Sequence, residues 1–155
     1  MPVYLLAFLI GVVSGLRSLT APAAVSWGAQ LGWIHLEDTS LAFLGYRFSP
    51  YIFSVLALGE IVNDKLPKTP SRKAAGPFVA RLVMGALSGA AIGAARQSLI
   101  AGLVAGIIGA VVGTYGGYEF RVRLAGLFGG NDLPAALIED AIAVLGAFWI
   151  ASHVS

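Results

Sequence analysis

The sequence contains no cysteine and few charged residues, and each scarcity excludes a class of protein. Without cysteine the chain has neither disulfides nor thiolate ligands for a metal. Only 12% of its 155 residues are charged, against roughly a quarter in soluble domains, while 57% are hydrophobic. In water, a domain of this size would have to bury several wholly apolar helices, which its surface-to-volume ratio disfavours. The composition therefore favours a membrane protein over a soluble one.

Catalytic and cofactor-binding motifs are also missing. The two histidines, His35 and His153, lie far apart, and the sequence has no HExxH motif, Walker loop, nucleophile elbow or dinucleotide fingerprint. The net charge of +2 is small, and the basic residues lie mainly in polar connections, which does not favour nucleic-acid binding. We therefore expect no catalytic residues, no metal, no cofactor and no nucleic-acid partner, and we do not predict an enzyme.

Long apolar stretches dominate what is present. Several approach the roughly 20 residues that a helix needs to cross the hydrocarbon core of a bilayer. They predict an all-α, polytopic transmembrane bundle of about five spans that forms one domain over the whole chain. The first span is expected to kink or break near Pro22, because proline removes a backbone donor and clashes with the preceding turn. The predicted spans are residues 3–30, 48–63, 77–95, 98–118 and 133–152.

Basic residues gather in two connections, residues 63–76 and 119–132. Because cytoplasmic loops carry an excess of Lys and Arg, this pattern predicts a cytoplasmic N-terminus and an external C-terminus. The first apolar segment does not fit a signal peptide, since its first basic residue, Arg17, lies within the apolar run instead of before it. We expect this segment to be retained.

Glycines at four-residue spacing give the clearest packing signal. Residues this far apart share one helical face, where missing side chains allow two backbones to approach closely. The short connection between the third and fourth spans favours packing of those two helices within one subunit. Self-association into a homo-oligomer is the alternative, and both are compatible because there is more than one stripe. The packing glycines are Gly85, Gly89 and Gly93 in one stripe and Gly109, Gly113 and Gly117 in another.

Arg17 is the strongest functional candidate. A charged side chain at the centre of a bilayer costs about 2.5–3.5 kcal/mol or more, so it needs a partner or a purpose. Arg17 lies near the middle of the first span, close to Ser18, Thr20 and the expected break at Pro22. A broken helix exposes backbone groups to a polar solute or ion, and a guanidinium recognises anions. The alternative is a buried ion pair with a carboxylate of another helix.

Four carboxylates are the other candidates for a solute or ion site. Glu60 and Asp64 are four residues apart and share a helical face, although Asp64 also suits a solvated loop. Glu139 and Asp140 are adjacent and point about 100° apart, so both cannot face the same neighbour. One of them would pair with Arg17 or Arg81, and the other would be protonated or face water, because burial disfavours a charged carboxylate. A purely structural network is the competing interpretation.

Two segments of the chain are faintly alike. Residues 10–15, IGVVSG, resemble residues 108–113, IGAVVG. With one span between the two pairs of helices, this similarity suggests an inverted repeat, as in many transporters. Six matched small or aliphatic residues are slender support for it.

Four segments carry a family resemblance that spans nearly the whole chain. They are GLRSLTAPAAVSW (residues 15–27), EIVNDKLPKTPSR (60–72), GTYGGYEFR (113–121) and IEDAIA (138–143). In these segments the chain resembles a bacterial family of small membrane proteins with no assigned substrate or reaction. The resemblance implies a multi-pass protein of the bacterial inner membrane and leaves the function open.

The charges within apolar spans favour a small transporter or channel-like protein for a small solute or ion. In this hypothesis Arg17 and the broken first helix form a polar site, and Glu60, Glu139 or Asp140 provides charge balance or proton coupling. The competing hypothesis is a non-transporting scaffold or lipid-interacting protein, whose charges only lock the bundle. In either case the expected partners are the lipid bilayer and further copies of the chain.

Overall fold

The chain folds into helices, and the described part contains no strand. In this computed structural model the described residues are 3–16, 19–34, 48–64, 75–95, 98–127, 129 and 132–154, with the backbone alone for 60–64, 75–77, 125, 132–133 and 135–136. The prediction of an all-α protein is confirmed. The six helices are α1 (Val3–Leu16), α2 (Thr20–Gln30), α3 (Ser49–Asp64), α4 (Ala75–Ala95), α5 (Leu99–Leu127) and α6 (Asp132–Ser152).

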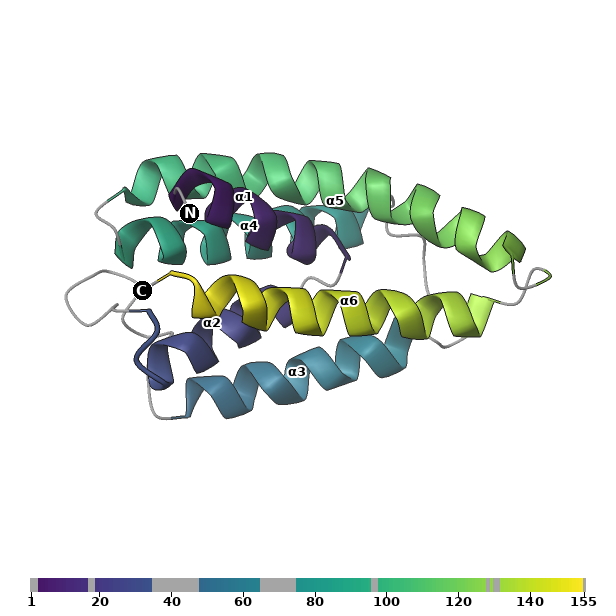
Figure 1. Ribbon diagram of the computed structural model, residues 1–155, viewed down its shortest axis with the longest axis horizontal. Coiled ribbons are helices and arrows are strands. Elements are labelled where there is room, and N and C mark those ends of the chain that lie inside the picture. Colours follow the sequence, from purple (N-terminus) through teal and green to yellow (C-terminus); the bar gives the residue numbers. More distant parts are fainter. Residues whose placement is uncertain are drawn as a thin grey trace.

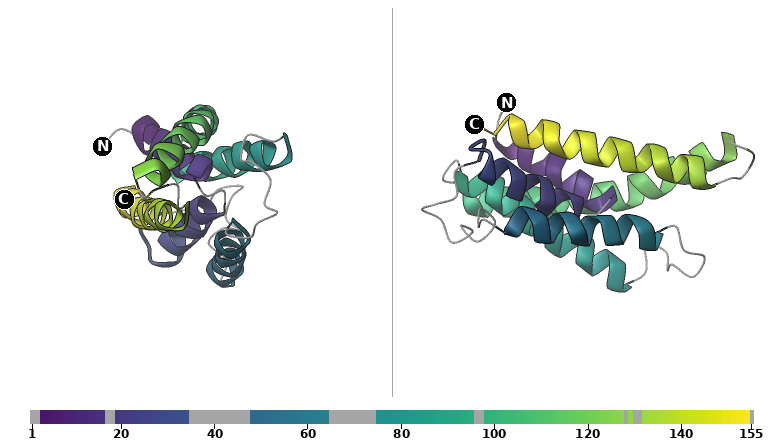
Figure 2. Two further views of the ribbon diagram at one scale, coloured as in Figure 1. Left: turned by 90° about the vertical axis from the view of Figure 1, so that its right-hand side faces the viewer. Right: turned by 90° about the horizontal axis from the view of Figure 1, so that it is seen from below.

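The helices run up and down along the long axis of the molecule, and successive helices point in opposite directions (Figures 1 and 2). This alternation includes α1 and α2, which form a hairpin. The first apolar stretch, residues 3–30, is therefore not one interrupted span as predicted, because the chain reverses where the span was expected to continue. The reversal leaves the described ends of the chain, at Val3 and Val154, at the same end of the bundle.

The break in the first apolar stretch lies just before Pro22. Helix α1 ends at Leu16, and α2 begins at Thr20 with Leu19 as its N-cap residue. The first backbone bond of α2 runs from the N–H of Ala23 to the carbonyl of Leu19, at 3.1 Å. Pro22 thus occupies the first turn of α2, where a backbone N–H would have no partner within the helix, so the proline fits without breaking it.

Glycines bring the backbones of α1, α4 and α5 into direct contact. A Cβ built on Gly89 of α4 would lie 2.8 Å from the Cα of Gly106, and one built on Gly93 would lie 2.9 Å from the Cα of Gly102. On another face of α5, a Cβ on Gly113 would lie 2.9 Å from the Cα of Val12 in α1. Side chains at these positions would force the helices apart, so the stripes fix α5 between α4 and α1.

Helix α5 is longer than the predicted span, residues 98–118. Glu119, Arg121 and Arg123 were expected to lie in a connection, but α5 continues through them to Leu127. These charges alternate with apolar residues, and Glu and Arg are good helix formers. Polarity alone was therefore a poor marker of where the helix ends.

Helices α2, α3 and α6 form the second group of the bundle, below the first in Figure 1. The α2–α6 contact uses small side chains, and a Cβ on Gly28 would lie 3.4 Å from the Cβ of Ala151. Helix α3 packs mainly against α2. Trp27 joins the two helices through a 2.8 Å hydrogen bond from its Nε1 to the Oγ of Ser54 and an edge-on contact with Tyr51.

Large apolar side chains remain exposed on the outer faces of the bundle. Within the described ranges, two helical segments, Phe78–Ala95 and Leu99–Leu124, are long and apolar enough to cross a membrane by length and composition, so the predicted bundle of five spans is not confirmed. On α3, side chains such as Val55 and Leu58 are exposed. The larger exposed residues of α5 and α6 include Ile100, Val104, Ile108, Val112, Ile142, Leu145 and Trp149.

Candidate functional site

The end of α1 lies inside the bundle. A Cβ on Gly15, in the last turn of α1, would lie 2.6 Å from the carbonyl oxygen of Ala110, near the middle of α5. Arg17 and Ser18, which connect the two helices, lie outside the described residues. We use the term hairpin tip for the described residues on either side of this connection, Gly15–Leu16 and Leu19–Thr20.

Arg81 of α4 is docked against the end of α1. Its side chain is only 7% exposed, and its Nη1 donates a 3.2 Å hydrogen bond to the carbonyl of Gly15. In return, the Oγ of Ser14 donates a 2.8 Å hydrogen bond to the carbonyl of Arg81. A cation at the carbonyl end of a helix meets the negative end of its dipole and satisfies a terminal acceptor. Arg81 therefore stabilises the end of α1 and places a positive charge beside the hairpin tip.

Thr20 opens α2 on the other side of the tip. Its side chain is only 3% exposed, and its Oγ1 has no hydrogen-bond partner among the described residues. The N-cap residue, Leu19, supplies no side-chain cap to the first turn of α2. A buried hydroxyl without a partner costs about 1–3 kcal/mol, so Thr20 is an energetically unfavourable polar group within the described part of the hairpin tip. The hydroxyls of Ser26 and Ser88 are also buried and also have no hydrogen-bond partner in the described part of the chain.

The two carboxylates of α6, Glu139 and Asp140, are both buried. Glu139 is only 1% exposed, and its Oε2 lies 3.9 Å from the Nη1 of Arg121 on α5. Since both are buried, neither faces water, and the other alternative, that one of them is protonated, stays a prediction. Arg121 was missed as a partner because it was expected to lie in a loop, whereas the longer α5 carries it to α6.

Glu60 and Asp64 occupy the last turns of α3. Their side chains lie outside the described residues, so their partners are not assigned. In the described part of the chain, no group of three or more His, Asp or Glu side chains is placed to hold a metal ion.

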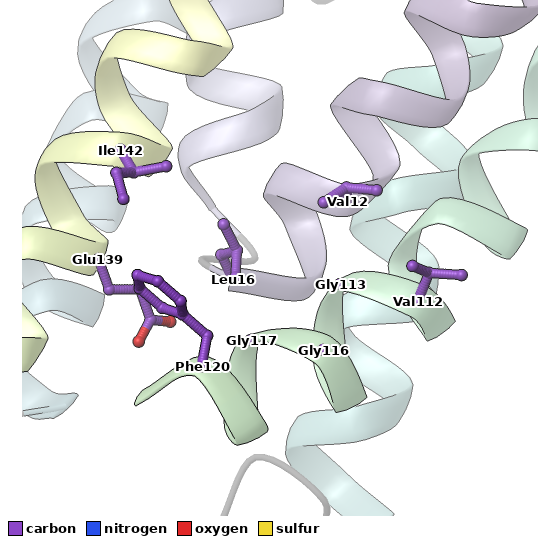
Figure 3. A pocket seen from close by; sticks show the side chains of 9 residues that line it. All are labelled: Val12, Leu16, Val112, Gly113, Gly116, Gly117, Phe120, Glu139 and Ile142. Carbon is purple, nitrogen blue, oxygen red and sulfur yellow. The ribbon is translucent and has the colours of Figure 1, made fainter. Parts of the chain in front are cut away.

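A groove of about 270 Å³ opens between α1, α5 and α6 (Figure 3). Glu139 is its one ionisable lining residue and is itself only 1% exposed, and Phe120 of α5 also lines the groove. The groove was not predicted from the sequence, because its walls come from three helices whose apolar residues look alike. The other lining residues are Val12, Leu16, Val112, Gly113, Gly116, Gly117 and Ile142.

Comparison with known proteins adds no relative, since no family model, curated protein or solved structure matches the chain.

Proposed function

We propose that the chain is a small multi-pass membrane protein that binds and moves a small anionic solute at the tip of the α1–α2 hairpin. The observation that carries this proposal is the position of the tip, which lies against the middle of α5 with the buried Arg81 beside it.

The exposed apolar faces of α3, α5 and α6 support placement in a bilayer, since contiguous apolar surface of this kind is rare on soluble monomers. At about 1.5 Å per residue, α1 and α2 measure about 21 and 16 Å, short of the roughly 30 Å hydrocarbon core. We therefore place them as a re-entrant hairpin and α4 to α6 as full spans. Helix α3 has 16 residues and measures about 24 Å, and we place it as a shorter span because its outer face is apolar and exposed. Irregular backbone at membrane depth is tolerated only where protein buries it or water reaches it.

The groups around the tip suit an anion. The first turn of α2 points backbone N–H groups and the positive end of the helix dipole toward the tip. Arg81 adds a guanidinium, Thr20 adds a buried hydroxyl, and Arg17 lies in the connection between the helices. Interrupted helices use such ends to hold solutes in many transporters. In this proposal Glu60, Glu139 or Asp140 supplies charge balance or proton coupling.

The topology follows from the hairpin. Because Val3 and Val154 lie at the same end of the bundle, an upright insertion puts both chain ends on one side of the membrane. This proposed arrangement differs from the expected cytoplasmic N-terminus and external C-terminus, an orientation that stays a prediction. The bacterial inner membrane stays the proposed location, and a homo-oligomer stays a prediction.

A pair of variants on one helix tests the proposal. Thr20→Val removes the hydroxyl at the tip and keeps the shape of the side chain, whereas Ser26→Ala removes an equally buried, unpartnered hydroxyl farther along α2. Proteoliposomes would be assayed for flux of chloride, acetate and inorganic phosphate, with potassium as the cation control. We expect wild-type and Ser26→Ala protein to conduct at least one anion, and Thr20→Val to lose most of that flux.

Arg17→Gln extends the test to the tip itself, with folding measured separately by size-exclusion chromatography and thermal unfolding. A folded variant without anion flux supports the site. The proposal is wrong if wild-type protein passes none of the anions, or if Thr20→Val and Ser26→Ala behave alike.

A non-transporting scaffold is the second candidate, and the exposed apolar face of α3 favours it. The glycine stripes on α4 and α5 make their contacts within the chain. A scaffold interface would therefore use the exposed face of α3 instead. Native mass spectrometry of detergent-extracted protein distinguishes the scaffold from the transporter. A scaffold should retain a protein partner or a second copy of the chain, and Leu58→Lys, which places a charge on the exposed face of α3, should release it.

A further inference from the structure

The groove between α1, α5 and α6 does not include Thr20 or Arg81 and is separate from the hairpin tip. Its wall on α5 is formed by Val112, Gly116 and Phe120, which follow one another at four-residue spacing (Figure 3). From Val112 to Phe120 this wall rises about 12 Å, at 1.5 Å per residue. The groove is therefore elongated along the helix, a shape that suits a hydrocarbon chain better than a compact solute.

Gly116 leaves the groove open. A Cβ built on it has nothing within 4 Å, whereas a Cβ on the neighbouring Gly113 would lie 2.9 Å from the Cα of Val12. Gly113 therefore serves the contact between α1 and α5, and Gly116 serves no contact among the described residues. Packing of the bundle does not account for the open space along this part of α5.

The side chains that line the groove are apolar apart from Glu139. That carboxylate is almost wholly buried and lies 3.9 Å from the Nη1 of Arg121, so it has a cation of its own and is withdrawn from the groove. An occupant therefore meets aliphatic side chains and the ring of Phe120. Apolar cavities stay dry and take up apolar ligands.

The groove opens onto the outer apolar surface of the bundle. Val112, Phe120 and Ile142 line the groove and are also exposed. On the same two helices, Ile108 and Leu145 continue this exposed surface. In the bilayer placement proposed above, the surface faces lipid, so acyl chains are the molecules that reach the groove from the side.

An exposed cation follows the groove on α5. Arg123 lies three residues beyond Phe120, a spacing that makes the two side chains neighbours on the helix surface. Arg121 contacts Glu139, whereas Arg123 has no carboxylate partner among the described residues. It also lies at the end of the apolar segment Leu99–Leu124, where a spanning helix reaches the headgroups. A guanidinium at this depth is placed to bind a lipid phosphate.

We propose that the groove binds a phospholipid of the bilayer, with one acyl chain along Val112, Gly116 and Ile142 and the phosphate at Arg123. The chain fills the space that α1, α5 and α6 leave between them, and the guanidinium pairs with the phosphate. Such a site rests on the bilayer placement in the proposed function, but it does not require the solute site at the hairpin tip.

Native mass spectrometry of the full-length protein, released from nanodiscs of phosphatidylglycerol, tests the acyl chain. Gly116→Leu fills the groove, and Gly59→Leu on α3 is its matched control, because both glycines are exposed and neither has an atom within 4 Å of its Cβ position. Each variant is first checked for wild-type elution in size-exclusion chromatography. We expect wild-type and Gly59→Leu protein to retain one phospholipid per chain, and Gly116→Leu to retain at least tenfold less.

Arg123→Gln tests the phosphate. The probes are lysophosphatidic acid and the monoacylglycerol with the same acyl chain, which differ only in the phosphate, and binding is measured by titration calorimetry in a non-ionic detergent. We expect wild-type protein to bind lysophosphatidic acid at least tenfold more tightly than the monoacylglycerol. Arg123→Gln should bind the two probes alike, and Gly116→Leu should bind both weakly.

Three results would overturn the proposal. The first is equal lipid retention by Gly116→Leu and Gly59→Leu, and the second is equal affinity of wild-type protein for the two probes. The third is a dimer that Gly116→Leu converts to a monomer without loss of lipid, because the occupant would then be a second copy of the chain. None of these measurements depends on flux, so a protein that moves no anion can still confirm the groove, and the two sites succeed or fail separately.

Discussion

The two groups of helices are held together in different ways. In the group of α1, α4 and α5, glycines bring backbones into contact, and there is no room for a methyl group at the interface. In the group of α2, α3 and α6, the contacts are made by side chains, and α3 packs mainly against α2. We therefore expect the first group to be more rigid than the second.

The hairpin connects these two groups. Helix α1 belongs to the glycine-packed group and α2 to the other, so the tip between Leu16 and Thr20 lies at their boundary. A displacement of one group against the other would change the surroundings of Arg81 and Thr20. This is the arrangement that the proposed solute site requires, because a transported solute must enter and leave it.

The largest effect is expected for Gly106→Leu. Gly106 meets α4 and α1 together: a Cβ on it would lie 3.1 Å from the Cα of Gly89, and a Cβ on Gly11 would lie 2.9 Å from the Cα of Gly106. Overpacking a core costs about 1–3 kcal/mol where neighbouring side chains can move aside. The neighbours of Gly106 are backbone atoms, which cannot move aside in this way, so the free-energy cost should be higher. We expect no monodisperse protein by size-exclusion chromatography. Gly116→Leu, which has open space, should elute as wild type, and equal behaviour of the two would contradict the comparison.

A smaller loss is expected for Arg81→Met, which keeps much of the length of the side chain. It removes the cation at the carbonyl end of α1, where hydrogen bonds to charged groups are worth about 1.5–3 kcal/mol. Thermal unfolding in detergent should show a clearly lower midpoint. An unchanged midpoint would mean that Arg81 does not fix the end of α1.

Ser14→Ala tests the reciprocal bond from α1 to α4. The variant loses the 2.8 Å hydrogen bond to the carbonyl of Arg81, and the free energy of unfolding should fall by about 1 kcal/mol. Because the two bonds join the same helices, the double variant with Arg81→Met should lose less than the sum of the single losses. Strict additivity would show that the bonds act independently.

The smallest loss is expected in the second group. Ser54→Ala removes the acceptor for Trp27 at a partly buried site between α2 and α3, where a hydrogen bond contributes about 0.5–1 kcal/mol at most. The midpoint of thermal unfolding should fall less than it does in Ser14→Ala. A larger fall than in Ser14→Ala would reverse the ranking of the two groups of helices.

Much of the fold could be predicted from the sequence, because apolar stretches and glycine spacing report directly on helices and close packing. Gly85, Gly89 and Gly93 face α5 within the chain, the arrangement favoured by the short connection. The reversal of direction between α1 and α2 could not be predicted in this way, because apolar length does not record the direction of a helix. That direction depends on which neighbours α1 and α2 pack against.

The similarity between residues 10–15 and 108–113 has a physical explanation in the fold. The two segments pack against each other, with Gly15 meeting the carbonyl of Ala110 and Gly109 meeting the backbone of Val12. Both therefore need small residues for the same reason. An inverted repeat is not required to account for the resemblance and stays a prediction.

The candidate site was predicted only in part. Thr20 and Arg81 could be singled out because polar residues in apolar spans need a reason. Ser14 and Arg121 could not, because a single serine in an apolar helix is unremarkable and the end of α5 was placed too early. The groove depends on three helices together, and no local pattern encodes it.

Cysteine accessibility tests the hairpin site most directly, since the chain has no cysteine of its own. Thr20→Cys and Ser26→Cys would each be treated, in proteoliposomes, with a membrane-impermeant thiol reagent, with and without the transported anion. The account predicts that Thr20→Cys reacts, that the anion protects it, and that Ser26→Cys does not react. If Thr20→Cys is as inert as Ser26→Cys, or reacts equally with the anion present, the tip of the hairpin is not a solute site.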